Sequence, residues 1–271
     1  IISIPKGAYI PDFSARIVSN EPNFATGKPE SISRKKITVA VLPFSNISND
    51  TTAVSFADGL GDHISTELTR YPELAVISYY SCRNIINKTT DIRELGLLLD
   101  AKYMLTGTVQ ISSNHVRIRV QLILSETREN IWANSYDRQS TFSNLLEIQD
   151  EIVRQVVSQT AGNYGAISRN LSNILPQKNI DDLKIYDAVF WYYNFVNNIS
   201  EEIFLKAEAA MQKAVETDPA YALGWAVLGE IFVGGYFMGY KSRFAEQQLE
   251  QAVLYGKKAI RLDPVCQHAY Q

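Results

Sequence analysis

Residues 41–64 bring together the residue types in this chain that could do chemistry at one place. The segment reads VLPFSNISNDTTAVSFADGLGDHI, an apolar run followed by two aspartates, two glycines and one histidine between Asp58 and His63. A strand that passes through a glycine-containing loop into a helix is the layout of many phosphate sites. Two carboxylates beside an imidazole could also bind a metal ion. The segment therefore raises two hypotheses, a phosphate cradle and a metal site.

The glycine spacing weighs against the phosphate cradle. Such a cradle needs several glycines so that backbone N–H groups converge, and this segment has only Gly59 and Gly61. Neither common nucleotide pattern, GxGxxG or GxxxxGK[ST], occurs there. Phe56 and Leu60 already belong to an apolar stripe at helical spacing, so the glycines fall inside a helix. We interpret the segment as a buried strand, a polar loop and the first turns of a helix.

The histidines and their neighbours do not form a metal-binding pattern either. Asp62 and His63 are adjacent, so on a helix they point to different faces. The other two histidines, His115 and His268, lie in a hairpin turn and near the end of the chain. We predict no metal site and no cofactor.

Other candidate groups have ordinary structural explanations. Glu147, Asp150 and Glu151 are paired carboxylates, but a solvated helix face explains them. Arg117 and Arg119 form a small basic stripe on a strand, for which we favour solvent exposure over the alternative of an acidic ligand. No serine occupies a nucleophile elbow. We therefore predict no catalytic residue and a protein that is not an enzyme.

The composition indicates a globular protein that does not grip nucleic acid by bulk charge. The 271 residues are enough for two domains, and the net charge is −3, whereas phosphate binding needs clustered Lys and Arg. Cys82 and Cys266 have no metal or redox spacing and are interpreted as buried free thiols. No run approaches the roughly 18 apolar residues of a membrane helix. Because the chain begins without Met inside an apolar pattern, we expect a fragment of a longer protein.

The first half of the chain has hairpin and then α/β patterning. Residues 1–13 alternate around Lys6-Gly7 and predict a hairpin, and residues 14–36 are a polar linker. ITVAVLPF predicts a strand buried on both faces. A helix follows, closing near Tyr71-Pro72, with one apolar face made by Phe56, Leu60, Ile64 and Leu68. LAVISYY predicts a second strand, and TTDIRELGLLLDA a short helix capped by Thr90 or Asp91.

Three more strands and a helix complete this part. YMLTGTVQI, VRIRVQLIL and NIWANSYDR are joined by short connections and predict an antiparallel meander. Gly107 in the first of them suggests a bulge or a close approach. The middle strand should bury every second residue from Val116 to Leu124. A helix from about Phe142 follows, so the predicted order is βαβαβββα, an α/β sandwich over residues 37–161.

Beyond a second linker at residues 162–182, a helical repeat dominates residues 183–271. Trp191 lies 34 residues before Trp225, which is the period of a tetratricopeptide (TPR) repeat. The chain is therefore predicted to be a multi-domain α+β/α protein, with the sandwich followed by an α-helical TPR array that is incomplete at its carboxyl end. The pattern rests on Trp191, Ala207, Ala214, Pro219, Trp225, Leu228, Gly229, Phe232, Ala252, Ala259 and Pro264.

The repeat departs from the usual pattern in two places. Asn194 and Phe195 stand where Leu-Gly is expected, and the second repeat is stretched by 11 residues around VGGYFMGYKSR. An unrelated helical bundle is the alternative. Tyr270 could open a third repeat, and short arrays usually need more units or a cap, so we expect the parent protein to continue.

The α/β part resembles the TolB-amino-terminal-like domain of bacterial regulatory proteins. The resemblance is carried by VAVLPFSNIS, FADGLGDHISTELTR, DIRELGLLLDAKYMLTGTVQ, VRIRVQLI and NIWANSYDR, in that order, over residues 37 to about 160. It implies a non-enzymatic domain that often precedes TPR repeats. It also implies an amino-terminal output module, commonly a winged-helix DNA-binding domain and sometimes an adenylate cyclase. The hairpin of residues 1–13 is similar to the end of such a winged-helix module, with an unrelated hairpin as the alternative.

The resemblance and the repeat together predict a non-catalytic sensory or scaffolding region of a bacterial transcriptional regulator. We expect the repeats to bind a protein partner, with DNA contacted only through a domain missing from this chain, no membrane contact here, and a homodimer as an open option. Localisation is expected to be cytoplasmic by analogy. The alternatives are the regulatory tail of a class III nucleotide cyclase and a small-ligand-binding α/β module. First helices should line the groove of the repeats, which makes the candidate partner-binding residues Tyr192, Val196, Ala226, Glu230 and Val233.

Overall fold

The chain divides into two compact units, Ile1–Ser31 and Ile32–Gln271. The computed structural model describes residues 36–48, 51–112, 114–174, 185–240 and 245–270, all in the second unit. The hairpin expected at residues 1–13 and almost all of the linker expected at residues 14–36 lie outside the described residues and stay predictions.

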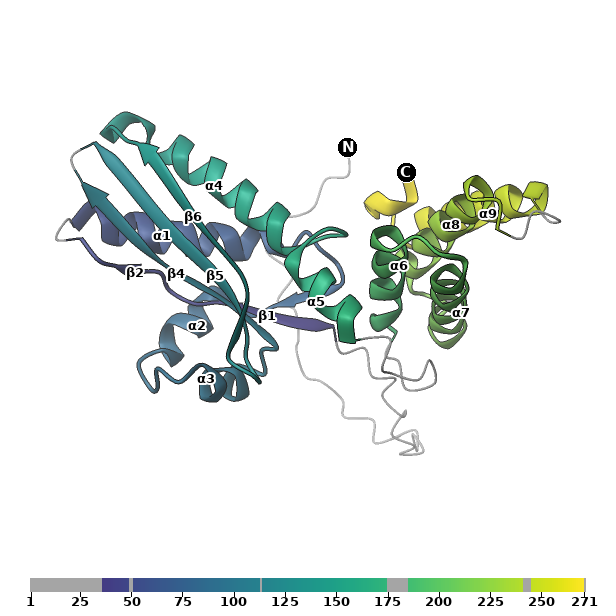
Figure 1. The fold of residues 1–271 in the computed structure, drawn as a ribbon, viewed down its shortest axis with the longest axis horizontal. Coiled ribbons are helices and arrows are strands. Elements are labelled where there is room, and N and C mark those ends of the chain that lie inside the picture. The colour runs from purple at the N-terminus through teal and green to yellow at the C-terminus, as the bar shows by residue number, and fades with distance from the viewer. Residues whose placement is uncertain (1–35, 49–50, 113, 175–184, 241–244, 271) are drawn as a thin grey trace, which may run out of the picture. The chain divides into compact units, whose positions relative to one another are not determined.

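A mixed β-sheet forms the centre of the first part of this unit. The described strands are β1 (Ile37–Val41), β2 (Ser45–Asn46), β3 (Leu74–Val76), β4 (Tyr103–Ser112), β5 (His115–Leu124) and β6 (Glu129–Gln139). Their spatial order is β3-β1-β4-β5-β6, with β2 paired to β4 off this path (Figure 1). β1 lies parallel to β3 and β4, whereas β4, β5 and β6 are antiparallel neighbours. The predicted meander is confirmed.

Strand β1 is buried on both faces, as its apolar sequence predicted. Because alternate residues of a strand point to opposite faces, its side chains divide between two core clusters. Val39 and Val41 pack in the cluster that contains residues of α1 (Thr51–Leu68) and α4 (Leu145–Thr160). Ala40 and the adjacent Leu42 pack in the cluster that contains residues of α2 (Tyr79–Ile85) and α3 (Ile92–Leu99). The sheet is therefore covered by a pair of helices on each face.

Strand β5 and helix α1 follow the periods read from the sequence. Alternate residues of β5 from Val116 to Leu124 are buried, and so is the predicted helical stripe Phe56, Leu60, Ile64 and Leu68. Gly107 marks a close approach rather than a bulge. A Cβ atom there would collide with the Arg119 carbonyl oxygen and lie 2.6 Å from the Phe44 ring. The irregularity in the meander lies instead between β5 and β6, at Leu122/Ile123.

The short helix α3 begins as expected at Asp91, one of the two predicted caps. The Asp91 carboxylate accepts hydrogen bonds from the backbone N–H groups of Arg93 (2.8 Å) and Glu94 (3.1 Å). These bonds satisfy two of the donors that a helix leaves unpaired at its first turn.

The predicted strand LAVISYY was wrong in its second half. Only Leu74–Val76 is a strand, and Tyr79 and Tyr80 begin helix α2. Tyrosines favour strands, but Tyr79 is buried and its hydroxyl donates to Asp58 of α1 at 3.1 Å. This tertiary contact outweighs local propensity.

The segment expected to be a linker, residues 162–182, contains a further helix, α5 (Ala166–Ile174). Its Ile167 and Leu171 are buried, although Ser and Asn dominate its other positions. The short β2 was also not predicted. The order βαβαβββα is otherwise observed, with η1 (Phe142–Asn144), a turn of 3₁₀-helix, leading into α4.

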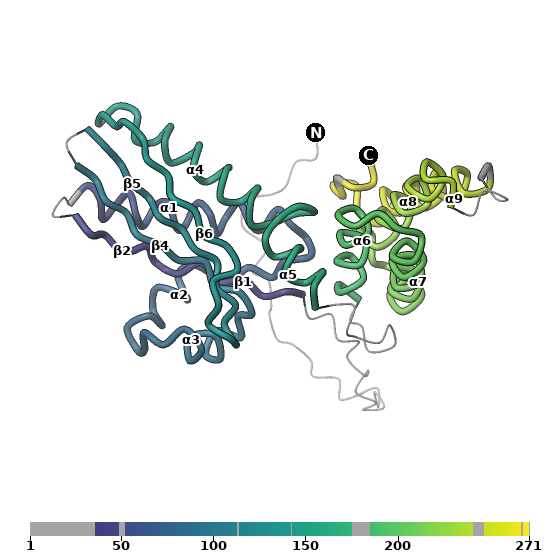
Figure 2. The backbone as a smooth tube through the Cα atoms, in the orientation of Figure 1, coloured from purple at the N-terminus to yellow at the C-terminus, as the bar shows by residue number. Residues whose placement is uncertain are grey.

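The described remainder of the chain is helical. It contains α6 (Asp187–Asn197), α7 (Glu201–Thr217), α8 (Ala222–Phe237), α9 (Ala245–Leu262) and a 3₁₀ turn, η5 (Gln267–Tyr270). Each of these helices packs against the next one in sequence, as Figure 2 shows for α6 with α7 and α8 with α9. Among the described helices, none combines the length and apolar character needed to cross a membrane.

Candidate functional site

The segment with Asp58, Gly59 and Gly61 serves helix packing. Asp58 accepts the Tyr79 hydroxyl and forms an ion pair with Arg83 of α2, at 2.8 Å. A Cβ atom on Gly61 would lie 2.7 Å from the Tyr79 ring, so the glycine lets α1 and α2 approach. Burial raises the pKa of Tyr79 above its usual value, and the charge of Asp58 raises it further. The glycine pair lies in the middle of α1, far from its free N–H groups.

The neighbouring histidine and carboxylates are also used in contacts between elements. His63 Nδ1 lies 3.5 Å from an Asp150 oxygen of α4. Glu151 accepts from Arg138 of β6 at 2.8 Å, and this hydrogen bond is the largest cause that lowers the pKa of Glu151. Arg117 pairs with Asp137 at 2.6 Å. Within the described ranges, no three His, Cys, Asp or Glu residues are grouped so that they could hold a metal ion.

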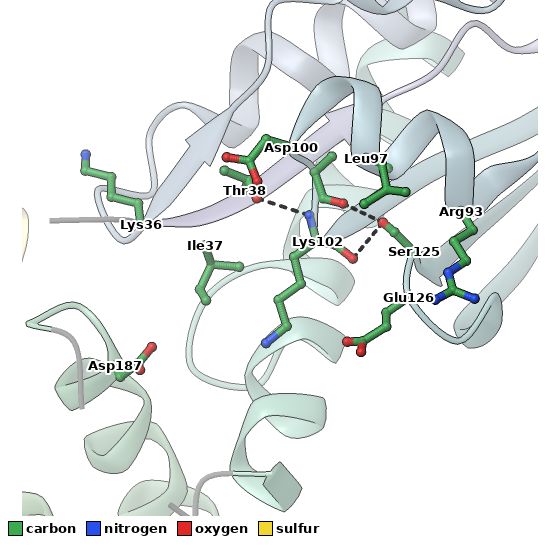
Figure 3. Close-up of a pocket in the computed structure, with 12 residues that line it drawn as sticks. Lys36, Ile37, Thr38, Arg93, Leu97, Asp100, Lys102, Ser125, Glu126 and Asp187 are labelled. Carbon is green, nitrogen blue, oxygen red and sulfur yellow. Dashed lines mark hydrogen bonds between the residues drawn. The ribbon is translucent and has the colours of Figure 1, made fainter. Parts of the chain in front are cut away.

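A polar cavity of about 460 Å³ lies beside the start of β1 and the end of α3 (Figure 3). The Lys102 N–H donates to Thr38 Oγ1 at 3.1 Å. The Ser125 hydroxyl donates to the carbonyl oxygens of Ala101 (2.6 Å) and Lys102 (2.8 Å). Because this hydroxyl is directed at two backbone carbonyls, Ser125 joins β5 to the start of β4 and is not placed as a nucleophile.

A larger cavity, of about 750 Å³, runs between α8 and α9, and we call it the α8/α9 groove. α6 contributes Tyr192, and η5 contributes His268 and Ala269. Three glycines, Gly229, Gly234 and Gly256, occur along it. The other lining residues are Ala226, Glu230, Val233, Leu249, Ala252, Val253, Lys257 and Ile260.

Four of the five candidate partner-binding residues lie together in this groove. They are Tyr192, Ala226, Glu230 and Val233. The fifth, Val196, is partly buried and packs against the hydrophobic core. It is not among the residues that line the groove.

Glu230 and His268 form the polar centre of the groove. Glu230 Oε1 lies 2.8 Å from His268 Nδ1. Burial lowers the pKa of His268, but the hydrogen bond and charge of Glu230 outweigh it, so the pKa is raised. Burial and then the charge of Glu230 raise the pKa of Tyr192. A hydrogen bond between the Tyr192 hydroxyl and Glu230 also contributes to the raised pKa of Tyr192, and the Oε2 atom of Glu230 is buried.

The aromatic repeat positions lie at helix contacts. Trp191 is buried in α6. Trp225 Nε1 donates to the Pro219 carbonyl oxygen at 3.0 Å, and Lys258 Nζ lies 3.4 Å from the Trp225 ring centre. Tyr255 of α9 contacts both Trp225 and Phe232 of α8, with ring centres 5.4 Å apart in each pair. These contacts hold α8 against α9.

The small and proline repeat positions mark close packing and helix ends. A Cβ atom on Gly229 would lie 3.2 Å from the Ala252 carbonyl oxygen, so α8 and α9 are in close contact there. Pro219 and Pro264 each follow a helix by two residues, after α7 and α9. The remaining repeat positions are all buried, namely Leu228, Ala207, Ala214, Ala252 and Ala259.

Sequence reasoning missed the other wall of the groove. Leu249, Val253 and Ile260 of α9 and His268 of η5 contribute to it. The spacing of Val253 and Ile260, one face of α9, was a signal that could have identified part of this wall. The approach of η5 to α8 is a tertiary contact that no local pattern specifies.

Comparison with known proteins finds similarity to a regulator domain and to a putative adenylate cyclase. A family model described as the second domain of HilA/YgeH-like transcriptional regulators matches residues 34–155. The curated protein "Putative adenylate cyclase 3" of Rhizobium meliloti (strain 1021) is 28% identical over 242 residues. This alignment covers 89% of the chain but only 40% of that relative, so the chain spans less than half of its length.

Similarity to solved structures is weak and partial. Lipoprotein GNA1162 from Neisseria meningitidis gives a TM-score of 0.34 at 15% identity, covering 45% of this chain and 99% of that one. TolB from Acinetobacter baumannii gives 0.31 at 14% identity, covering 48% of this chain and 30% of that one.

Proposed function

We propose that this chain is a non-catalytic regulatory segment that binds a protein partner in the α8/α9 groove. A regulatory role is supported by the match of residues 34–155 to a domain of transcriptional regulators. The alignment with the longer relative includes most of both the α/β part and the helical part. Such a segment would act as an accessory to another domain of the same protein. A cytoplasmic location belongs to this proposal, because a transcriptional regulator meets DNA there.

We further propose that α6 to α9 are two TPR-like helix pairs, α6 with α7 and α8 with α9. Trp191 and Trp225 occupy similar positions near the starts of α6 and α8, 34 residues apart. The proline positions follow α7 and α9 at the same distance. Tetratricopeptide arrays bind partners along a concave surface formed by the stacked repeats. The candidate partner-binding residues belong to the first helices, which would line this surface.

The observation that carries the proposal is the composition of the groove. Its walls include Val233, Val253 and Ile260, whose burial would favour association with an apolar segment. Its lining includes the carboxylate of Glu230, which would attract a basic side chain. The partner segment that fits is therefore apolar on one side, with a Lys or Arg placed to reach Glu230.

The route from partner to output is the second part of the proposal. By its resemblance to regulators of this domain order, the α/β part would relay partner binding to a DNA-binding domain elsewhere in the parent protein. Deletion of residues 183–271 from the full-length protein should abolish the effect of the partner on transcription. The same deletion should leave binding of the parent protein to its operator DNA intact. Loss of operator binding in that deletion would contradict a relay role.

A second candidate is the regulatory tail of a nucleotide cyclase. It is favoured by the similarity of 89% of the chain to a protein described as a putative adenylate cyclase. The two candidates share the same segment, so the domain joined to it in the parent protein distinguishes them. Recombinant full-length protein that forms cyclic nucleotide from ATP or GTP would support the cyclase candidate over the DNA-binding one. Ligand binding by the α/β part was the third prediction and stays a proposal.

Site-specific photocrosslinking tests partner binding in the groove. A benzophenone amino acid replaces Val253, which is 54% exposed on the groove wall, in full-length protein expressed in its own host. The matched control carries it at Leu205 of α7, which is 46% exposed and outside the groove. The proposal expects a discrete crosslinked protein from the Val253 position and a much weaker band from Leu205. Equal labelling from both positions, or none, would contradict it.

A further inference from the structure

A second buried carboxylate lies in a different cavity, of about 590 Å³. This cavity is formed by the end of α1 and the turn after it, by α4, and by the segment that follows α9. Its lining includes apolar side chains at Val157, Leu223 and Val265 and the aromatic ring of Tyr71. The other lining residues are Glu67, Arg70, Pro72, Glu73, Arg154, Ser158, Asp263, Cys266 and His268.

Glu73 is the most deeply buried charged residue of this lining, with 1% of its surface exposed. Its Oε1 atom accepts the Tyr193 hydroxyl of α6 at 3.0 Å. Its Oε2 atom is buried and has no hydrogen-bond partner among the described residues. A buried carboxylate oxygen without a donor costs free energy, so such atoms usually have a partner in the functional protein.

Three of the cations near Glu73 are engaged with other groups. His268 is bonded to Glu230, and Arg70 lies 3.1 Å from Glu67. Lys36, ahead of β1, lies over the Tyr186 ring at 5.4 Å. Burial is the largest effect on Glu73 and raises its pKa. The hydrogen bonds to its carboxylate from its own backbone N–H and from Tyr193, and the charges of His268 and Lys36, only partly offset this rise of the pKa. Within the part of the chain that the structure describes, no side chain donates a hydrogen bond to Glu73 Oε2.

We propose that this cavity binds a small organic ammonium ion, with Glu73 Oε2 as its anchor. An ammonium group supplies N–H donors and the positive charge that a buried carboxylate lacks. The ring of Tyr71 offers a surface that attracts a cation. The apolar side chains of Val157, Leu223 and Val265 would contact the alkyl part of the ligand. This site is distinct from the α8/α9 groove, and the proposal does not depend on protein binding there.

Isothermal titration of the whole chain with n-butylammonium chloride tests the proposal, with n-butanol as the neutral probe of similar size. Saturable binding of the amine and no binding of the alcohol are expected. The variant Glu73→Gln keeps an acceptor for Tyr193 but removes the charge, and its affinity for the amine should fall by about tenfold or more. Glu216→Gln, an exposed carboxylate of α7 outside this cavity, is the matched control and should bind within about twofold of the unmodified chain.

Acidification gives a second readout on the unmodified chain. Because an ammonium ion needs the ionised carboxylate, affinity should decrease as the pH is lowered toward the raised pKa of Glu73. Circular dichroism of Glu73→Gln establishes that this variant is folded. Absence of saturable amine binding, equal binding of butanol, or unchanged affinity in folded Glu73→Gln would each overturn the proposal.

Discussion

The buried carboxyl group of Glu73 makes the stability of the fold depend on pH. Its carboxyl group is nearly inaccessible to water, and burial raises its pKa above the ordinary 4.5. A carboxyl whose pKa is higher in the folded than in the unfolded state favours folding in its protonated form. Its contribution to stability is therefore lost as the pH rises from about 4.5 through the folded pKa.

The variant Glu73→Gln should consequently unfold at a higher temperature than the unmodified chain at pH 8. The amide carries no charge to bury, whereas ionised Glu73 does. The difference in unfolding temperature should shrink toward pH 4, where Glu73 is protonated and therefore uncharged, like the glutamine. Thermal unfolding followed by circular dichroism at pH 4, 6 and 8 measures both effects. A variant less stable than the unmodified chain at pH 8 would show that the charge itself stabilises the fold.

His268 should produce a pH dependence at higher pH. Its hydrogen bond to Glu230 raises its pKa above the ordinary 6.5 despite the opposing effect of burial. The stabilisation by this pair is fully present below about pH 6.5 and is lost as the pH rises through the folded pKa. Urea unfolding of the chain and of His268→Gln between pH 6 and 9 should show a difference in unfolding free energy that narrows as the pH increases. A constant or widening difference would mean that His268 is uncharged in the folded chain.

In helix α1, alanine substitutions test whether Gly59 and Gly61 serve helix packing. Gly59→Ala should stabilise the chain by about 0.5–1 kcal/mol, because alanine is the better helix former. The added Cβ would lie 3.4 Å from the Gln149 side chain, an ordinary contact.

Gly61→Ala is the matched change two residues along the same helix. Its Cβ would lie 2.7 Å from the Tyr79 ring, so we expect a loss of about 1–3 kcal/mol from overpacking. Urea unfolding of both variants gives the two free energies. Similar effects of the two substitutions would contradict the α1–α2 contact described for Tyr79.

Elements with a clear period were predictable and elements set by distant contacts were not. β5 and α1 repeat apolar residues at spacings of two and about four, which specify a half-buried strand and a helix stripe. Helix α2 depends on Tyr79 reaching Asp58, 21 residues earlier in the chain. α5 depends on two apolar side chains, at Ile167 and Leu171, within a polar segment. Neither dependence is visible in a local window.

The candidate site was predictable to the same extent. The repeat pattern assigned Tyr192, Ala226, Glu230 and Val233 to first helices, which were expected to line the groove, and these four residues line one cavity. The sequence pattern did not specify the wall contributed by α9 or the pairing of Glu230 with His268, because both depend on how the helices pack. Val196 shows the opposite failure, since a position on the expected face packs against the core.

At the level of the whole molecule, we propose a regulatory segment with two separate binding places. The α8/α9 groove would bind a protein and the cavity at Glu73 a small cation. Both places include residues of the helical part, and His268 of η5 lines each of them. Ligand in one cavity could therefore alter affinity in the other, and such coupling would be reciprocal.

The most direct test of partner binding in the α8/α9 groove is the affinity of the crosslinked partner for variants of this groove. Titration calorimetry compares the unmodified chain with Val253→Glu, a charge on the groove wall, and with Leu205→Glu, the same change on α7. Both positions are exposed, so both variants should fold. If the partner binds in the groove, Val253→Glu should bind it about tenfold or more weakly than the unmodified chain does. Leu205→Glu should bind it within about twofold of the unmodified chain. Equal affinities for the two variants would contradict partner binding in the groove.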